Sequence, residues 1–234
     1  MTVITINPDC LRVIEGITMY SIKEAFYSLQ GEGAHAGRPA IFCRFTGCNL
    51  WTGKEKHRAS AKCQFCDTDF IGTDGQNGGK FKTAEALIEH LDTLWPEQTS
   101  HKYLIFTGGE PALQLDEALI AAAKASHYTL AIETNGTLPL PDGIDWICVS
   151  PKTAEPLVVN QGSELKLIFP QDHLPPNLFS DLEFEHFYLQ PMDQSALPEG
   201  HERINDAQAQ TIRYCLQNPQ WRLSLQTHKM LGID

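Results

Sequence analysis

Short apolar runs separated by polar turns give the chain the pattern of an α/β protein. Residues 103–107, Tyr-Leu-Ile-Phe-Thr, form a continuous apolar run, which is typical of a strand buried in a parallel sheet. Thr83 can cap a helix that carries an apolar stripe and ends before Pro96. Further helices are predicted over 115–126 and 206–216, and further strands over 129–133, 146–150, 164–168, 187–189 and 221–225.

Alternation of strands and helices predicts right-handed crossovers and a parallel sheet. About six such strands with few helices favour an α/β fold built as a partial, open TIM-like barrel with reduced helices. No repeat, low-complexity tract or linker divides the chain. We therefore expect a single domain over 1–234, in which residues 1–18 are an N-terminal extension or a short edge strand.

Two strands are predicted before this alternation begins, over 20–29 and 39–46. The first runs into Gln30-Gly31-Glu32-Gly33, most simply a hairpin turn with an exposed Glu32. In the strand predicted over 39–46, alternation places Ile41, Cys43 and Phe45 on one face and Arg44 on the other. A buried arginine needs an anion: a protein carboxylate, such as that of Glu32, or the carboxylate of a substrate. Reaching solvent is the third alternative for Arg44.

Polar residues follow the predicted strands at their carboxyl ends. Ligands of parallel α/β folds bind at these ends, so the groups should converge on one mouth. They are Gly108-Gly109-Glu110, Glu133-Thr134-Asn135, Ser150-Pro151-Lys152 and Gln190.

Composition narrows the range of partners and compartments. The formal net charge is −11 and no Lys/Arg-rich run interrupts the acidity, so nucleic acid is not expected as a partner. No apolar run is long enough to span a bilayer, and the N-terminus lacks a signal pattern. We expect a cytoplasmic protein, whose thiols stay reduced. Four of the seven cysteines are expected to be structural: Cys10, Cys43, Cys148 and Cys215.

The other three cysteines, Cys48, Cys63 and Cys66, lie in a polar, aperiodic segment that should be a loop folded around a metal. Three thiolates are one ligand short of a closed tetrahedral site. They could hold a [4Fe–4S] cluster with one iron left open, or a structural zinc whose fourth ligand is His57. The cysteines alone are compatible with either metal.

The ordered motifs resemble those of the radical S-adenosylmethionine (SAM) superfamily, and in particular the 7-carboxy-7-deazaguanine synthase family. The usual cysteine spacing of the superfamily is Cys-x3-Cys-x2-Cys, and the longer Cys-x14-Cys-x2-Cys found here matches a subset of that family. The matching motifs are Phe-Tyr-Ser-Leu-Gln-Gly-Glu-Gly (26–33), Phe-Cys-Arg-Phe-Thr-Gly-Cys-Asn-Leu-Trp (42–51), Cys-Asp-Thr-Asp-Phe (66–70), Thr-Gly-Gly-Glu-Pro (107–111), Glu-Thr-Asn-Gly (133–136), Ser-Pro-Lys (150–152) and Gln-Thr-His-Lys (226–229).

The resemblance implies a radical lyase that uses a [4Fe–4S] cluster, S-adenosyl-L-methionine and Mg²⁺. Its substrate would be 6-carboxy-5,6,7,8-tetrahydropterin, whose ring contracts with loss of ammonia in queuosine or other deazapurine biosynthesis. An electron donor of the flavodoxin or ferredoxin type and a homodimer are also implied.

The resemblance also assigns residues. The cluster ligands would be Cys48, Cys63 and Cys66, and Mg²⁺ would bind the Thr68 hydroxyl, with Asp67 and Asp69 as alternatives. Glu110 would receive the ammonium group of the cofactor, and Arg44 the substrate carboxylate. The remaining cofactor-binding residues would be Gly108, Gly109, Glu133, Ser150, Lys152 and Gln190. The remaining substrate-binding residues would be Gln30, Glu32, Thr107, Gly109, Asn135, His228 and the terminal carboxylate of Asp234, which is otherwise a surface tail.

Two other readings stay open at this point. The chain could be another radical enzyme, such as an activase that forms a glycyl radical on a protein, although a protein substrate does not call for Arg44 in a small pocket. It could also be a non-catalytic zinc-binding protein that uses Cys48, His57, Cys63 and Cys66.

Overall fold

The computed structural model describes residues 19–96, 100–194 and 206–233. The expected extension at 1–18, with Cys10, and the terminal Asp234 lie outside these residues. The strands are β1 (Tyr20–Leu29), β2 (Pro39–Phe45), β3 (Gly79–Phe81), β4 (Tyr103–Gly108), β5 (Thr129–Thr134), β6 (Trp146–Val149), β7 (Gln161–Phe169), β8 (Glu183–Pro191) and β9 (Trp221–Leu223). The helices are α1 (Ala84–Asp92), α2 (Glu117–Ala125), α3 (Ala207–Gln217) and α4 (Thr227–Leu231).

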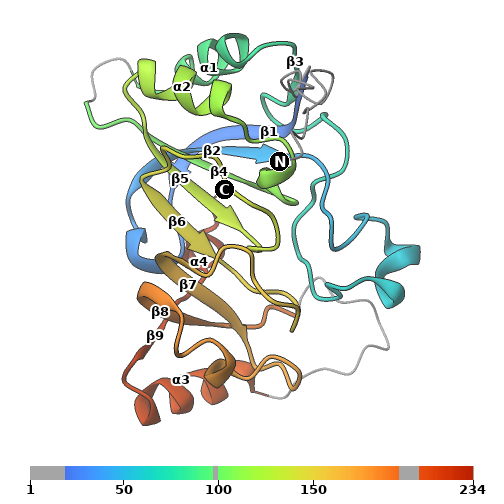
Figure 1. Ribbon diagram of the computed structural model, residues 1–234, viewed down its shortest axis with the longest axis vertical. Helices are drawn as coiled ribbons and strands as arrows, with labels where there is room; N and C mark the ends of the chain where they lie inside the picture. The colour runs from blue at the N-terminus through green and yellow to red at the C-terminus, as the bar shows by residue number, and fades with distance from the viewer. Residues whose placement is uncertain (1–18, 97–99, 195–205, 234) are drawn as a thin grey trace, which may run out of the picture.

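All these strands form one sheet in the order β3-β1-β2-β4-β5-β6-β7-β8-β9. From β2 to β9 each neighbouring pair is parallel, whereas β1 pairs antiparallel with both β2 and β3. The sheet curves without closing, and its strands follow one another down the molecule in Figure 1. The predicted open, partial barrel is confirmed, with an antiparallel edge added to it.

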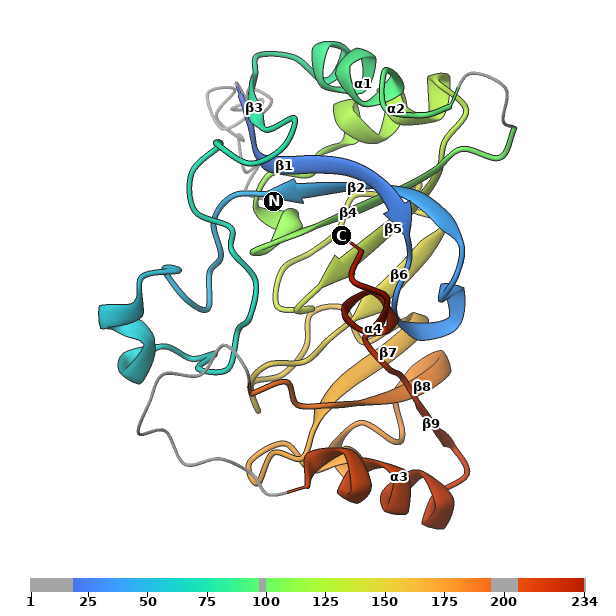
Figure 2. The same cartoon turned by 180° about the vertical axis from the view of Figure 1, so that it is seen from behind.

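Helices cover the convex face at its two ends. α1 and α2 lie over the β1 end and α3 lies at the β9 end (Figures 1 and 2). Thr83 caps α1 as predicted, accepting a hydrogen bond from the Ala86 amide at 3.1 Å, but the helix ends at Asp92, before the predicted Trp95. Leu87, Leu91 and Leu119 of the two helices are fully buried against the sheet.

Alternation along β2 separates this core from the inner face. Ile41, Cys43 and Phe45 are fully buried in the core beneath α1 and α2, as the pattern predicts. Phe42 and Arg44 face the concave side. The strands thus present polar groups to the inside of the curve, where a ligand can reach them.

None of the helices in the described part of the chain is long and apolar enough to cross a membrane.

Candidate active site

A cavity of about 340 Å³ lies at the carboxyl ends of the parallel strands. The cysteine loop, the turn after β1, the ends of β4 to β8 and the segment of α4 all contribute to its wall. Nearly all of the predicted site residues line it: Gln30, Glu32, Arg44, Cys48, Cys63, Cys66, Thr68, Thr107, Gly108, Gly109, Glu133, Asn135, Ser150, Lys152, Gln190 and His228. Glu110 does not, and Asp234 lies outside the described residues.

The cysteine loop is held from outside the cavity by Arg58, a buried residue of the short 3₁₀ helix Glu55–Ser60. Its guanidinium donates to the carbonyl oxygens of Gln64 at 2.9 Å and Cys66 at 3.1 Å, and lies 4.2 Å from the ring centre of Trp51. The 3₁₀ helix projects from the body of the protein in Figures 1 and 2. A residue between Cys48 and Cys63 therefore holds the backbone of the Cys63–Cys66 segment in place.

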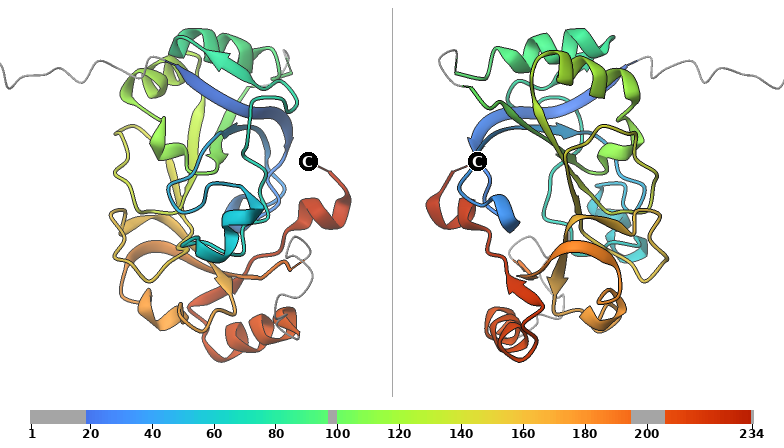
Figure 3. Two further views of the ribbon diagram at one scale, coloured as in Figure 1. Left: turned by 90° about the vertical axis from the view of Figure 1, so that its right-hand side faces the viewer. Right: turned by 60° about the vertical axis from the view of Figure 1, so that its left-hand side comes forward.

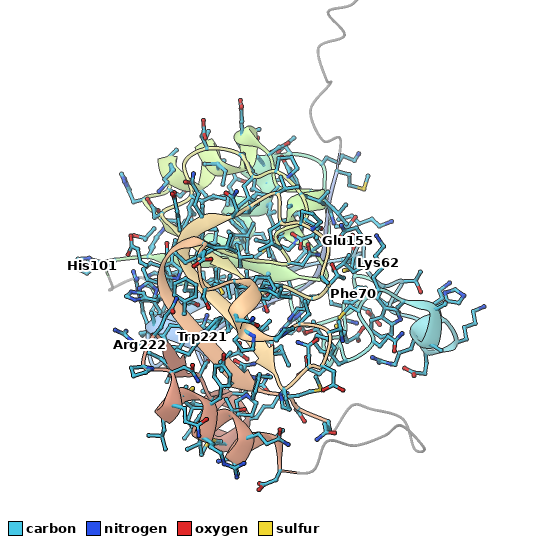
Figure 4. All side chains as sticks on the ribbon, turned by 60° about the horizontal axis from the view of Figure 1, so that its bottom comes forward. Lys62, Phe70, His101, Glu155, Trp221 and Arg222 are labelled. Atoms are coloured by element: carbon cyan, nitrogen blue, oxygen red, sulfur yellow. The ribbon has the colours of Figure 1, made fainter. Side chains whose placement is uncertain are left out.

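A surface ion pair ties the same loop to the connection between β6 and β7. Lys62 and Glu155 lie 2.7 Å apart and adjoin each other in Figure 4, on the side of the molecule that also carries Phe70. The labelled residues His101, Trp221 and Arg222 lie away from this group.

The three cysteines lie together without His57, the fourth ligand that the zinc alternative requires. The three thiol-bearing residues line one cavity, but His57 does not, and its Nδ1 atom lies 2.8 Å from the Thr52 hydroxyl. Within residues 19–96, 100–194 and 206–233, no three His, Cys, Asp or Glu side chains converge on one ion, the three cysteines included. The position of His57 therefore gives no support to a fourth zinc ligand, whereas the choice of metal on the three cysteines stays a prediction. Burial raises the pKa of Cys63 to about 11, so metal binding must displace a proton from this thiol.

Two glycines allow the β4 turn to lie against the start of the cysteine loop. A Cβ atom on Gly109 would lie 2.0 Å from the Gly47 carbonyl oxygen and 3.1 Å from the Cys48 Cβ. Gly108 has φ +132°, and a Cβ there would meet the Phe45 carbonyl oxygen at 2.3 Å. The glycine pair thus lets the turn after β4 lie against the first cysteine.

Glu110 lies behind the cavity wall, and its role as the group that receives the cofactor's ammonium group stays a prediction. Its side chain is fully buried and accepts hydrogen bonds from the Thr134 hydroxyl, the Asn135 amide and the Ala112 amide. Burial raises the pKa of Glu110, against the effect of these bonds. The carboxylate therefore joins the turns after β4 and β5, and it orients Asn135 in the cavity.

Glu32 is held inside the site and is not the exposed turn residue of the simplest prediction. The turn does join two antiparallel strands, but the Glu32 side chain is only 13% exposed. Its Oε2 atom lies 2.5 Å from the Nζ of Lys166, and its Oε1 accepts from Gln190 and Gln226 at 3.1 and 3.0 Å. Burial alone would raise the pKa of Glu32, but the charge and hydrogen bond of Lys166 lower it to about 2.

Arg44 pairs with Glu24, so Glu32 is not its partner. The Arg44 Nε donates to Glu24 Oε1 at 2.7 Å across the β1–β2 pair, where the two residues are in register. Both side chains line the cavity, and Arg44 keeps a fifth of its surface exposed. The guanidinium has donors left for a ligand, since this pairing uses only one N–H.

The carboxylates on both sides of Thr68, those of Asp67 and Asp69, form ion pairs with lysines. Thr68 itself lies at the cavity wall. Asp67 accepts from Lys229 at 2.7 Å, and Asp69 pairs with the buried Lys23 at 2.9 Å. The two alternative magnesium ligands are thus engaged in ion pairs, whereas no hydrogen bond from the Thr68 hydroxyl is found among the described residues.

The C-terminal segment closes one side of the cavity through α4, which was not predicted. Thr227 donates its amide to the Gly31 carbonyl at 3.0 Å, and a Cβ on Gly31 would lie 2.1 Å from His228 Nδ1. α4 lies beside the turn after β1 in the right-hand view of Figure 3. Lys229 bridges Asp67 and Asp193, which joins this segment to the cysteine loop.

Sequence reasoning missed Lys166, Gln226 and Lys229. All three line the cavity. For Lys166 a signal was available, because a lysine between Leu165 and Leu167 in an apolar strand has to find an anion.

The fold and the site define the class of protein: a radical SAM enzyme. The sequence profile described as the Radical SAM superfamily matches residues 57–162, which include Cys63 and Cys66. The crystal structure of QueE from Escherichia coli superposes with a TM-score of 0.64 at 25% identity, covering 88% of this chain and 93% of that one.

Curated relatives identify the family within this class. The 7-carboxy-7-deazaguanine synthases of Bordetella pertussis, Burkholderia multivorans and Caulobacter vibrioides are 60%, 56% and 56% identical, and each match covers 92% of this chain and 99% of the relative. The chain belongs to the 7-carboxy-7-deazaguanine synthase family. It is accordingly a radical SAM lyase that acts on a small molecule.

Proposed function

We propose that the chain converts 6-carboxy-5,6,7,8-tetrahydropterin to 7-carboxy-7-deazaguanine with loss of ammonia, in the biosynthesis of queuosine or another deazapurine. The relatives' name supplies the product. The observation that carries the proposal is the composition of one cavity, in which three thiols lie with Arg44 and the Gln30–Glu32 turn. A carboxylated pterin offers its carboxylate to Arg44 and its N–H donors to the Gln30–Glu32 turn.

Cys48, Cys63 and Cys66 are the residues that would hold the [4Fe–4S] cluster. The cluster and S-adenosylmethionine, when bound, supply a 5′-deoxyadenosyl radical that takes a hydrogen atom from the substrate. The backbone of Gly108 and Gly109 leaves space beside Cys48 for the methionyl group. Residues at the neighbouring strand ends contact the rest of the cofactor: Glu133, Ser150, Lys152 and Gln190. Glu110 supports this wall through the turns that it joins.

The substrate is oriented by groups of opposite charge at its two ends. Arg44 binds the substrate carboxylate with the N–H donors that Glu24 leaves unused. Gln30 and Glu32 accept from the aminopyrimidinone edge. Thr107, Gly109, Asn135 and His228 complete the substrate site. Together these contacts exclude water and hold the reacting carbon in place.

Thr68 would provide the single protein ligand of a Mg²⁺ ion. Magnesium keeps most of its coordination for water and substrate oxygens, so one hydroxyl is sufficient. The ion pairs of Asp67 with Lys229 and of Asp69 with Lys23 support this choice over either carboxylate.

The remaining partners are also proposals. An electron donor of the flavodoxin or ferredoxin type reduces the cluster, and the protein acts as a homodimer. The reaction takes place in the cytoplasm, where the cysteine ligands stay reduced.

The test is a product assay under anaerobic conditions. Reconstituted protein is given the tetrahydropterin, S-adenosylmethionine, Mg²⁺ and a reductant, and the products are identified by mass spectrometry. We expect 7-carboxy-7-deazaguanine and ammonia from the wild type and neither from a Cys66→Ala variant. Cleavage of S-adenosylmethionine without conversion of the pterin would contradict the proposal and indicate a different radical reaction.

A further inference from the structure

Lys166 lies at the centre of the polar side of the cavity. Its side chain is 4% exposed on β7, and its Nζ atom lies 2.5 Å from Glu32 Oε2 and 3.5 Å from Glu133 Oε1. Glu32 belongs to the turn after β1 and Glu133 to β5, so one ammonium group joins two distant parts of the wall. Both carboxylates line the cavity with it.

Amide side chains complete a ring around this ammonium group. Gln30 donates to Glu133 Oε1 at 3.0 Å, and its own Oε1 accepts the Glu32 amide at 3.1 Å. Gln190 and Gln226 donate to Glu32 Oε1. Within the described part of the chain Glu32 thus accepts three hydrogen bonds, and a carboxylate has about four acceptor positions, so one is left for a ligand.

Three carboxylates and a thiol surround Lys166. It faces the carboxylates of Glu32 from the turn, Glu133 from β5 and Glu164 from β7 itself, and the thiol of Cys148 from β6, which burial keeps protonated. His228 of α4 acts in addition on Glu32. Burial acts to lower the pKa of Lys166, but the surrounding carboxylates raise it well above its ordinary value. The lysine is therefore a permanent cation in a site with a surplus of negative groups.

We propose that Lys166 is a positioning residue of the substrate site: its ammonium group pairs with Glu32 and Glu133 and fixes the ionised Glu32 against the aminopyrimidinone edge of the substrate. This inference rests on the proposed function. The aminopyrimidinone edge presents neighbouring N–H donors, and an ionised carboxylate acts only as a hydrogen-bond acceptor, so the two are complementary. A protonated carboxyl group would itself be a donor, and would oppose a donor of the ligand.

The reason that a lysine is needed follows from burial. A carboxylate on the wall of a dry cavity tends to take up a proton unless a cation faces it. Truncating one member of a buried charge pair leaves the other unpaired, which accounts for most of the loss that such variants show. Without Lys166 the pKa of Glu32 should rise, because burial alone acts in that direction.

The test compares Lys166→Met with a matched control, Lys102→Met. Lys102 is half-buried, pairs with Asp92 at 2.7 Å and does not line the cavity. For Lys166→Met we expect kcat/KM to fall on the order of 10²-fold, mainly through KM. Binding of 6-carboxypterin, an oxidised compound that does not react, should weaken to a similar extent, as measured by fluorescence titration. Iron content should match that of the wild type.

The pH profile distinguishes positioning from a purely structural role. In the wild type Glu32 stays ionised, so kcat/KM should show no acid limb from it between about pH 5 and 8. Lys166→Met should gain such a limb as Glu32 is protonated. Lys166→Arg keeps the cation, so it should show no new limb, although its larger head group raises KM. This second variant decides the question if Lys166→Met does not fold.

Wild-type turnover separates the two proposals. If the wild type forms the product but Lys166→Met binds 6-carboxypterin normally, the role of Lys166 is overturned and the function stands. A new acid limb in Lys166→Arg as large as that expected for Lys166→Met would also overturn the role. If the wild type forms no product, it is the proposed function that fails.

Discussion

Replacing Gly109 with alanine tests whether the turn after β4 positions the first cysteine. The added Cβ would lie 2.0 Å from the Gly47 carbonyl oxygen, where ordinary contact begins at 3.4 Å, and the obstacle is backbone. The turn and the loop must therefore separate, which breaks the 2.8 Å hydrogen bond from the Glu110 amide to Gly47. Overpacking costs about 1–3 kcal/mol and the lost hydrogen bond about 1 kcal/mol. We expect Gly109→Ala to lose about 2–4 kcal/mol of stability.

The assay is thermal unfolding together with the iron content after reconstitution. For a domain of this size 1 kcal/mol lowers Tm by about 2–4 °C, so Tm should fall by at least 4 °C or so. Iron content should fall as well, because Cys48 moves with the loop. Gly79→Ala is the control, since its Cβ would meet only the Phe81 ring at 3.4 Å. If both variants unfold at the same temperature and bind the same iron, the reasoning is refuted.

Three further variants test separate parts of the site. Arg44→Lys should lower kcat/KM at least about 10-fold with unchanged iron content, because a lysine cannot grip a carboxylate with two parallel bonds; unchanged kinetics would refute the carboxylate role. Glu110→Gln should lower the denaturant midpoint by the equivalent of about 1–3 kcal/mol, since an amide nitrogen cannot accept from the buried donors at that position; an unchanged midpoint would show that these bonds do not matter. Thr68→Val should remove the response of kcat/KM to added Mg²⁺, and a full response would exclude Thr68 as the ligand.

Much of the fold was predictable because the strong patterns are local. The strand predicted over 20–29 has the observed bounds of β1. β7 and β8 extend beyond their predicted bounds, because their polar first residues, Gln161 and Glu183, carry no apolar signal. β3 was not predicted, because Gly79–Phe81 is short and only its pairing with β1 makes it a strand.

The membership of the site was predictable, but its internal pairings were not. Motif residues converge because the topology brings strand ends together. The partner of Glu32 is Lys166, which is 134 residues away, and no local pattern links the two. Arg44 meets Glu24 because β1 and β2 pair antiparallel with an irregularity between Ile22 and Glu24. Such a shift in register is set by tertiary packing and cannot be read from alternation alone.

The content of iron and acid-labile sulfide, measured after anaerobic purification, tests the central claim most directly. The account predicts about four of each per chain, bound through Cys48, Cys63 and Cys66, with one iron free of any side chain. A colourless protein that holds a single zinc ion on these cysteines would contradict it.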